Sequence, residues 1–135
     1  MCGIFAYAGT ENAVPLLIEG LRSVEYRGYD SAGISVIDSS GEIQTVKRGD
    51  HKASLENLAV AAGESQLSGV VGIGHTRWAT HGEVNQQNSH PHASSDGSVS
   101  IAHNGIIENF IELKDQLVDS GFEFKSETDS EVLAH

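Results

Sequence analysis

Apolar residues along the chain form three helical stripes separated by short apolar runs. The first helix is predicted to begin after Asn12, a capping residue, with Pro15 tolerated in its opening turn. Two further helices are expected over 55–62 and over 110–118, the last closed by Gly121. The first stripe has the i, i+3, i+4, i+7, i+10 spacing of an amphipathic helix and consists of Val14, Leu17, Ile18, Leu21 and Val24.

Short runs between the helices predict strands. The first run, GIFAYA at 3–8, is apolar on both parities, which is typical of a strand buried on both faces. The other strands are expected at 32–37, 42–48, 70–75, 98–101 and 122–125. A turn at 39–41 makes the second and third strands a hairpin. Hairpins mixed with helices predict an α+β fold in layers.

Two segments stand apart from this pattern. After 70–75 the chain shows no periodicity for more than about 20 residues, and so long a stretch is usually functional. Residues 128–131, TDSE, have the form of a capping box and predict a helix start. Because the chain stops at His135, just after this signal, we expect it to be part of a longer domain. The runs 3–8 and 70–74 would then lack part of their cover and present unpaired edges, which are prone to aggregation.

The composition excludes several classes of protein. A chain of 135 residues, 39% of them hydrophobic, is typical of one soluble globular domain. No apolar stretch approaches the roughly 20 residues of a membrane span, and no secretory leader is present. The 19 acidic and 8 basic residues give a net charge of −11, which opposes binding to nucleic acid or to an anionic membrane surface. A single cysteine fits a reducing compartment, so the cytoplasm is expected.

That cysteine, Cys2, directly follows the initiator Met1. Methionine is normally removed before so small a residue, which would make Cys2 the N-terminus. One residue would then carry a thiol nucleophile and an α-amine base, with reference pKa values of about 8.5 and about 7.7–8.0. The alternative is that a cysteine at this position is accidental.

Two other groups have chemistry suited to binding a carboxylate and to acyl transfer. Arg77 offers the planar fork that binds a carboxylate bidentately, and Thr80 and His81 add donors nearby. Alternatively, Arg77 is a surface charge and Trp78 a core aromatic. Separately, the Asn-Gly pair at 104–105 supplies a side-chain amide and a backbone N–H, the two donor types of an oxyanion hole, although Asn-Gly is also a common turn.

Other kinds of site are less well supported. Asp129 lies in a predicted first helical turn, where a carboxylate is favourable for dipole reasons alone, so a counter-ion role needs outside support. Histidines at 75, 81, 90 and 92 lack a nearby carboxylate in a spacing such as H-E-x-x-H, and we expect no metal site. The glycine-rich run 69–74 has the wrong order for a dinucleotide fingerprint and precedes no helix, so we exclude nucleotide binding there.

Six motifs occur in order along the chain: MCGIFAYAG, YRGYDSAGI, GHTRWATHG, NSHPH, HNGIIENF and SETDSEV. Together they resemble the N-terminal glutaminase domain of the glutamine–fructose-6-phosphate aminotransferase family, also called glucosamine-6-phosphate synthases. Other class II glutamine amidotransferases share the opening MCGI and an HNG, but YRGYDSAG and HTRWATHG are similar to the glucosamine-phosphate branch. The resemblance spans essentially all of the chain.

The resemblance implies a layered αββα N-terminal-nucleophile fold and hydrolysis of L-glutamine without a metal or organic cofactor. The site residues that it implies are Cys2 as nucleophile and amine base, Asn104 and Gly105 as oxyanion hole, Arg77, Thr80 and His81 for the glutamine α-carboxylate, Asp129 for its α-ammonium, and Trp78, Arg27 and Asp30 in structural or gating roles.

The resemblance also implies a larger protein around residues 1–135. In the family, the glutaminase domain continues past Asp129, and a sugar-isomerase domain binds fructose 6-phosphate and receives the ammonia. A homodimer is expected for such a full-length protein. Two alternatives stay open: an amidotransferase with a different ammonia acceptor, and a non-catalytic module that binds glutamine or a partner protein. Retention of Met1 would favour the second.

Overall fold

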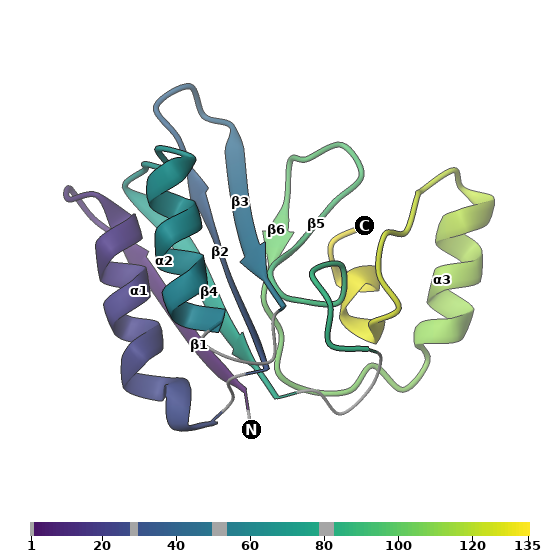
Figure 1. The fold of residues 1–135 in the computed structure, drawn as a ribbon. Helices are drawn as coiled ribbons and strands as arrows, with labels where there is room; N and C mark the ends of the chain where they lie inside the picture. The colour runs from purple at the N-terminus through teal and green to yellow at the C-terminus, as the bar shows by residue number, and fades with distance from the viewer. Residues whose placement is uncertain (1, 28–29, 50–53, 79–82) are drawn as a thin grey trace.

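Four layers make up the fold in the computed structural model, which describes residues 2–27, 30–49, 54–78 and 83–135. Helices α1 and α2 cover one face of a four-stranded sheet, and a two-stranded sheet lies on the other side, followed by α3 (Figure 1). The elements of these residues are β1 (Gly3–Ala8), α1 (Ala13–Val24), the 3-10 helix η1 (Glu25–Arg27), β2 (Ser31–Ile37), β3 (Ile43–Arg48), α2 (Ser54–Glu64), β4 (Val71–Arg77), β5 (His92–Ala93), β6 (Ser100–Ile101), α3 (Phe110–Asp119) and the 3-10 helix η2 (Asp129–Leu133). The predicted layered α+β architecture is confirmed.

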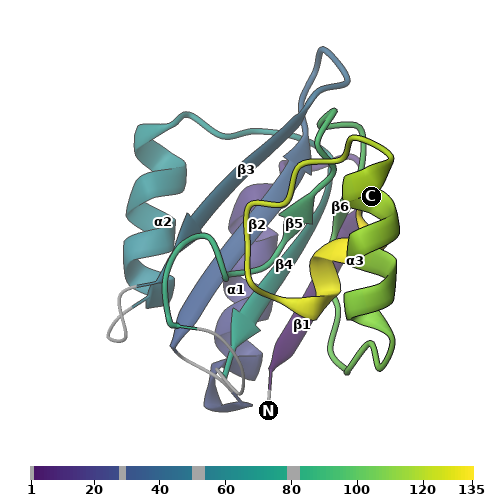
Figure 2. The same cartoon turned by 90° about the vertical axis from the view of Figure 1, so that its right-hand side faces the viewer.

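The large sheet is antiparallel throughout and has the strand order β1-β4-β2-β3 (Figure 2). Strand β4 is therefore interior, and β1 and β3 are the outer strands. The prediction that 3–8 is buried on both faces is wrong, because β1 is an outer strand and only Gly3 in it is fully buried. The prediction of an unpaired edge at 70–74 is also wrong, since β4 pairs with β1 on one side and β2 on the other.

The main hydrophobic core lies between this sheet and its two helices. The predicted cap of the first helix is confirmed, because Asn12 Oδ1 accepts a hydrogen bond from the Val14 N–H at 3.2 Å. Leu17 and Leu21 of α1 are completely buried, and burial of such a side chain contributes about 1.5–3 kcal/mol. The other buried apolar residues of this core are Ala13, Val14, Ile18, Ala32, Ile34, Val36, Leu55, Leu58 and Ala62.

The C-terminal third departs from the predicted elements in two places. Residues 122–125 are not a strand, because the Phe122 N–H donates to the Leu117 carbonyl at the end of α3 rather than to a neighbouring strand. The helix predicted to start at 128–131 is the 3-10 helix η2, and its N-cap residue, Thr128, makes no side-chain capping hydrogen bond. Glu131 instead accepts from the N–H groups of Lys125, at 2.8 Å, and Ser126, at 2.7 Å. The predicted end of α3 is confirmed, with Gly121 at φ +92°.

The interface between the two sheets is polar rather than aliphatic. Ser35 of β2 joins Thr45 of β3 at 2.7 Å, and Ser100 of β6 donates to the same Ser35 hydroxyl at 2.8 Å. Beside them, a Cβ added to Gly33 would lie 2.2 Å from the carbonyl oxygen of His90. Hydrogen bonds and this close backbone approach therefore position the second layer on the first.

No helix in the described residues is both long and apolar enough to cross a lipid bilayer.

Candidate active site

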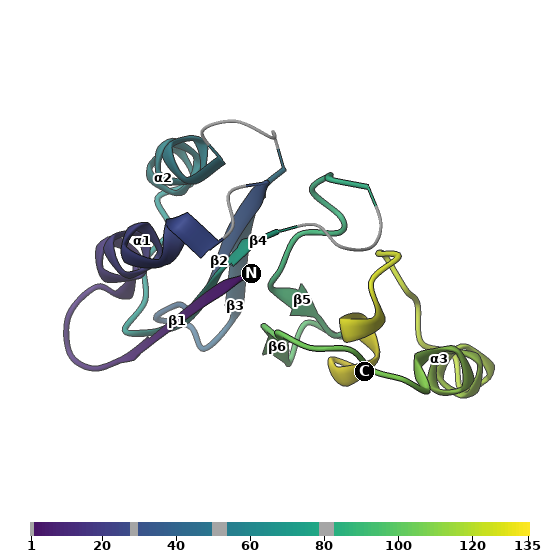
Figure 3. The same ribbon diagram turned by 90° about the horizontal axis from the view of Figure 1, so that it is seen from below.

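Cys2 lies immediately before β1, beside the end of β4. The register that pairs Gly3 with Thr76 brings the Cys2 sulfur to Trp78, whose N–H donates to Sγ at 3.2 Å. The Gly3 N–H also donates to Thr76 Oγ1 at 3.2 Å. Figure 3 looks onto this end of the sheet, with the N-terminal end of the chain beside β1 and β4. The half-buried thiol is thus held in place by main-chain contacts.

Gly3 is required at this position by close packing. A Cβ on Gly3 would lie 2.4 Å from Cγ2 of Val24, at the end of α1, and 2.8 Å from Thr76 Oγ1. Any side chain would therefore displace the residue that follows the nucleophile. Sequence reasoning did not single out Gly3, and the only signal for it was its place next to Cys2 at the start of a strand.

Asn104 approaches Cys2 from the second layer. It follows β6, and its Nδ2 donates to the Cys2 carbonyl oxygen at 3.1 Å. Its Oδ1 lies 2.8 Å from His75 Nε2. The side chain is exposed, as is Gly105 after it. The structure therefore brings an amide with an accessible face to the predicted nucleophile, across 102 residues of sequence.

Arg77, the last residue of β4, is only 6% exposed, so the interpretation as a surface charge is wrong. Its Nη1 donates to the Glu83 carbonyl at 3.2 Å. Burial lowers the pKa of the guanidinium, and the neighbouring Cys2 and Asp30 partly oppose this effect. The guanidinium is thus a buried positive charge beside the Cys2 thiol, where it can interact with an anionic group.

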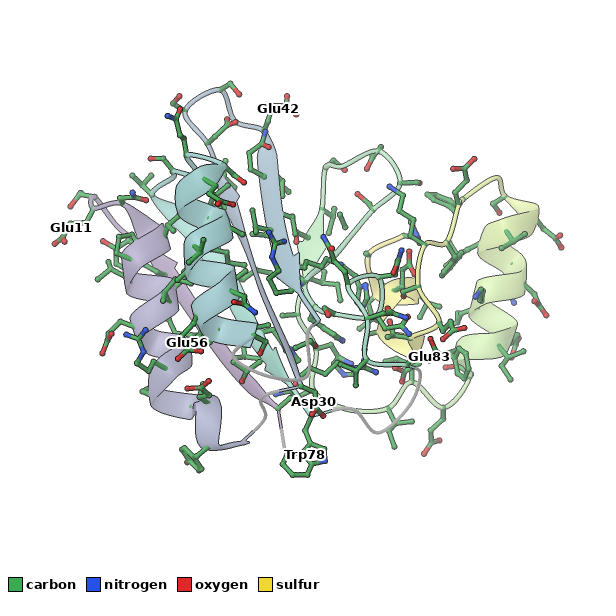
Figure 4. The ribbon with its side chains drawn as sticks, viewed as in Figure 1. Glu11, Asp30, Glu42, Glu56, Trp78 and Glu83 are labelled. Carbon is green, nitrogen blue, oxygen red and sulfur yellow. The ribbon has the colours of Figure 1, made fainter. Side chains whose placement is uncertain are left out.

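Trp78 and Asp30 lie at the same end of the sheet, opposite Glu11 and Glu42 (Figure 4). Trp78 is 43% exposed, so the interpretation as a core aromatic is also wrong. The Asp30 N–H donates to the Arg77 carbonyl at 3.0 Å, which extends the β2–β4 pairing. Three other predicted site residues lie wholly or partly outside the description, namely Thr80, His81 and the side chain of Arg27.

Asp129 opens η2 and contacts the loop that carries Asn104 and Gly105. Its Oδ2 accepts from the Ile107 N–H at 2.7 Å, and its Oδ1 lies 3.3 Å from the Ser130 hydroxyl. The same hydroxyl is 3.1 Å from Nδ1 of His103, the residue before Asn104. The half-buried carboxylate is thus hydrogen-bonded to the loop that carries Asn104. Its charge therefore lies on the same side of the site as Asn104.

Three buried histidines line the interface behind Asn104. The His75 and His90 rings stack at 4.3 Å, and His92 meets His90 edge-on at 4.4 Å. Burial lowers the pKa of His75 to about 4 and that of His92 to about 3, and it lowers the pKa of His90 as well. All three are therefore neutral at pH 7. Within the described residues, no group of three or more His, Cys, Asp or Glu side chains could hold a metal ion.

The sequence and the fold of this chain are similar to those of known proteins. A glutamine amidotransferase domain profile matches residues 59–135. Curated glutamine–fructose-6-phosphate aminotransferases (isomerizing) are similar over the whole chain, with 51% identity for that of Clostridium tetani and 53% for that of Thermus thermophilus. The chain spans only 22% of the length of each of these relatives.

A solved structure is also similar. The glutamine phosphoribosylpyrophosphate amidotransferase from B. subtilis, complexed with ADP and GMP, superposes with a TM-score of 0.78 at 31% identity, covering 100% of this chain and 28% of that one. The layered fold is thus that of an N-terminal-nucleophile amidotransferase. Since the domain profile covers more than half of the sequence, this chain belongs to the glutamine amidotransferase domain family.

Proposed function

We propose that this chain hydrolyses the side-chain amide of L-glutamine to glutamate and ammonia through a thioester on Cys2. The observation that carries the proposal is the convergence of two contacts on one residue. The Trp78 N–H donates to the Cys2 sulfur at 3.2 Å, and the Asn104 amide donates to the Cys2 carbonyl at 3.1 Å. A thiol and a donor suited to an oxyanion are therefore adjacent, as acyl transfer requires.

The nucleophile in this proposal is the Cys2 thiolate, generated when the residue's own α-amine takes the thiol proton after removal of Met1. Sulfur attacks the amide carbon of glutamine and forms a tetrahedral oxyanion. The carbon–nitrogen bond then breaks, ammonia leaves with the transferred proton, and water hydrolyses the thioester to release glutamate.

Asn104 and Gly105 are assigned to the oxyanion. The Asn104 nitrogen carries two hydrogens, of which one is directed at the Cys2 carbonyl, so the second can be donated to substrate. The backbone N–H of Gly105 is the expected second donor. Loss of one such donor typically costs about 10²–10³ in rate.

The two charged groups of the substrate are each assigned to side chains around Cys2. Arg77, with Thr80 and His81, is proposed to bind the glutamine α-carboxylate, and Asp129 to pair with the α-ammonium. Burial of Arg77 and the main-chain contact of Asp129 support these roles, because both charges are held in fixed positions. We assign structural or gating roles to the neighbouring Trp78, Arg27 and Asp30.

For the whole protein we propose that the ammonia converts fructose 6-phosphate to glucosamine 6-phosphate in the cytoplasm, in a homodimer. The identity of 51–53% to aminotransferases of that name supports this acceptor over others. Residues 1–135 are assigned to the glutaminase part. The sugar-isomerase part is assigned to sequence corresponding to the rest of the longer relatives.

The test compares the full-length protein that contains this chain with its Cys2→Ala variant. Glutamate release from glutamine should fall by at least about 10³-fold in the variant. The control is Val60→Ala on the exposed face of α2, which should hydrolyse glutamine normally.

Intact mass should show loss of Met1 in active protein and, after acid quenching, a glutamyl adduct that Cys2→Ala lacks. Full activity of Cys2→Ala would refute the proposal. Glutamine binding by the wild type without turnover would instead support the non-catalytic binding module.

A further inference from the structure

His75 is a polar residue in the buried interior of the large sheet, where apolar side chains usually pack. It lies in β4 between Ile4 of β1 and Gly33 of β2, and it is 1% exposed. Its Nδ1 is buried and finds no hydrogen-bond partner among the described atoms. A buried, unpaired ring nitrogen lowers the stability of the fold. The other ring nitrogen makes the contact that accounts for a histidine here.

That other nitrogen, Nε2, lies 2.8 Å from Asn104 Oδ1. Because Asn104 Nδ2 donates to the Cys2 carbonyl, its oxygen is the atom that faces His75, and the reverse orientation would oppose two carbonyl oxygens. The Asn104 oxygen can only accept, so His75 Nε2 must carry the proton. This tautomer also leaves Nδ1 as a bare acceptor, which agrees with its lack of a donor.

The two contacts of Asn104 determine the plane of its amide. Its side chain is exposed, and without the contact on Oδ1 the bond to Cys2 would be the one hydrogen bond among the described residues that limits its rotation. With Oδ1 held by His75 and one Nδ2 hydrogen on the Cys2 carbonyl, the second hydrogen has a single direction. Preorganised donors of this kind account for much of the catalysis in acyl transfer.

His75 is itself well placed to act as an anchor. Its backbone is in the middle of the sheet, with strand pairing on both sides, and its ring stacks on His90 at 4.3 Å with an interplanar angle of 18°. The His90 Nδ1 in turn accepts from the His103 N–H at 3.3 Å, next to Asn104. The imidazole is therefore held by the strand pairing of its backbone and by the His90 ring stacked on it.

We propose that His75 is a positioning residue for glutamine hydrolysis, which holds the Asn104 amide so that its free N–H meets the oxyanion formed on Cys2. The inference rests on the function proposed above. It predicts that His75 affects the stabilisation of the oxyanion and leaves the nucleophilicity of the thiol unchanged.

The experiment uses the full-length protein and two readouts. Glutamine hydrolysis forms an oxyanion, whereas alkylation of Cys2 by iodoacetamide is a displacement that forms none. In His75→Phe, which removes the donor but keeps a ring, kcat should fall by about 10²-fold, with KM changed by less than about threefold. The rate of Cys2 alkylation should stay within about twofold of the wild type.

A matched pair of amide variants tests the reach of the donor. In His75→Gln the side-chain N–H takes the place of Nε2–H and should keep kcat within about tenfold of the wild type. In His75→Asn, one methylene shorter, it should not reach Asn104, and kcat should fall as in His75→Phe. This pair decides the question even if His75→Phe does not fold.

A double-mutant cycle with Asn104→Ala completes the test. If His75 acts through Asn104, adding His75→Gln or His75→Asn to Asn104→Ala should lower kcat no further. Independent, multiplying losses would overturn the inference, as would equal activity of the Gln and Asn variants or parallel losses of hydrolysis and alkylation. If the wild type shows no glutaminase activity, the proposed function fails and this inference fails with it. An active wild type with unaffected His75 variants overturns the inference alone.

Discussion

Replacing Gly33 with alanine should separate the two sheets at the point where they meet. The new Cβ would lie 2.2 Å from the His90 carbonyl oxygen, whereas real Cβ atoms essentially never approach another heavy atom within 3.0 Å. The obstructing atom belongs to the main chain and cannot rotate away, so the His90 backbone must move by at least about 0.8 Å. Overpacking of this kind typically costs about 1–3 kcal/mol.

Hydrogen–deuterium exchange of the full-length protein measures this cost locally. A loss of about 1–3 kcal/mol corresponds to about 5- to 150-fold faster exchange in peptides covering 88–94. Glutaminase kcat should also fall, because the His90 ring stacks on His75, which contacts Asn104.

The matched control is Gly63→Ala in α2, where a Cβ meets nothing within 4 Å and alanine should stabilise the helix by about 0.5–1 kcal/mol. Unchanged exchange over 88–94 in Gly33→Ala, alongside slower exchange in α2 of the control, would refute the reasoning.

Three further predictions concern charged groups. Burial raises the pKa of Glu131, but hydrogen bonds from the Ser126 side chain and nearby backbone outweigh it and lower the pKa overall. Glu131 therefore stabilises the fold above its unfolded pKa of about 4.3, and this contribution is lost as the pH falls through the folded pKa. When the free energy of unfolding is measured against pH, Glu131→Gln should lack this acid-dependent loss. Both Arg77→Lys, which removes the bidentate fork, and Asp129→Asn should weaken glutamine binding by calorimetry, and unchanged affinity in both would contradict the assignment. Glutaminase kcat/KM should rise with pH through one pKa at or below about 7.7–8.0, the value of a free Cys2 amine, and a flat profile from pH 5 to 9 would exclude the amine as base.

Helices that pack on the large sheet could be predicted because their 3.6-residue period directly records which face is buried. Leu17 and Leu21 lie on the face of α1 that packs against the sheet, so they are both apolar and completely buried. Strand β1 was mispredicted because apolar composition does not reveal which strand is outermost, and that depends on β4 pairing between β1 and β2. Residues 122–125 were mispredicted because their N–H partners are Leu117 and Glu131, which no local pattern records.

In the candidate site, too, some features could be predicted from the sequence and others could not. Residue type alone identified a thiol at Cys2 and a paired amide and glycine at 104–105, since few side chains offer that chemistry. The contact between His75 and Asn104 could not be predicted, because it depends on the register of β4 and on the path of the chain after β6. The packing of Gly3 against Val24 is likewise a consequence of where α1 ends on the sheet.

The long separation between Cys2 and its partners also has a consequence for synthesis of the chain. Cys2 leaves the ribosome well before its partners, because the Trp78 N–H and the Asn104 amide follow 76 and 102 residues later. At about 5–20 residues per second, the thiol waits for about 5–20 s before Asn104 has even been made. Until β4 has been made, β1 has no strand to pair with, and the N-terminus is open to processing enzymes. Assembly of the nucleophile is thus a late, long-range event, and trimming of the N-terminus can precede it.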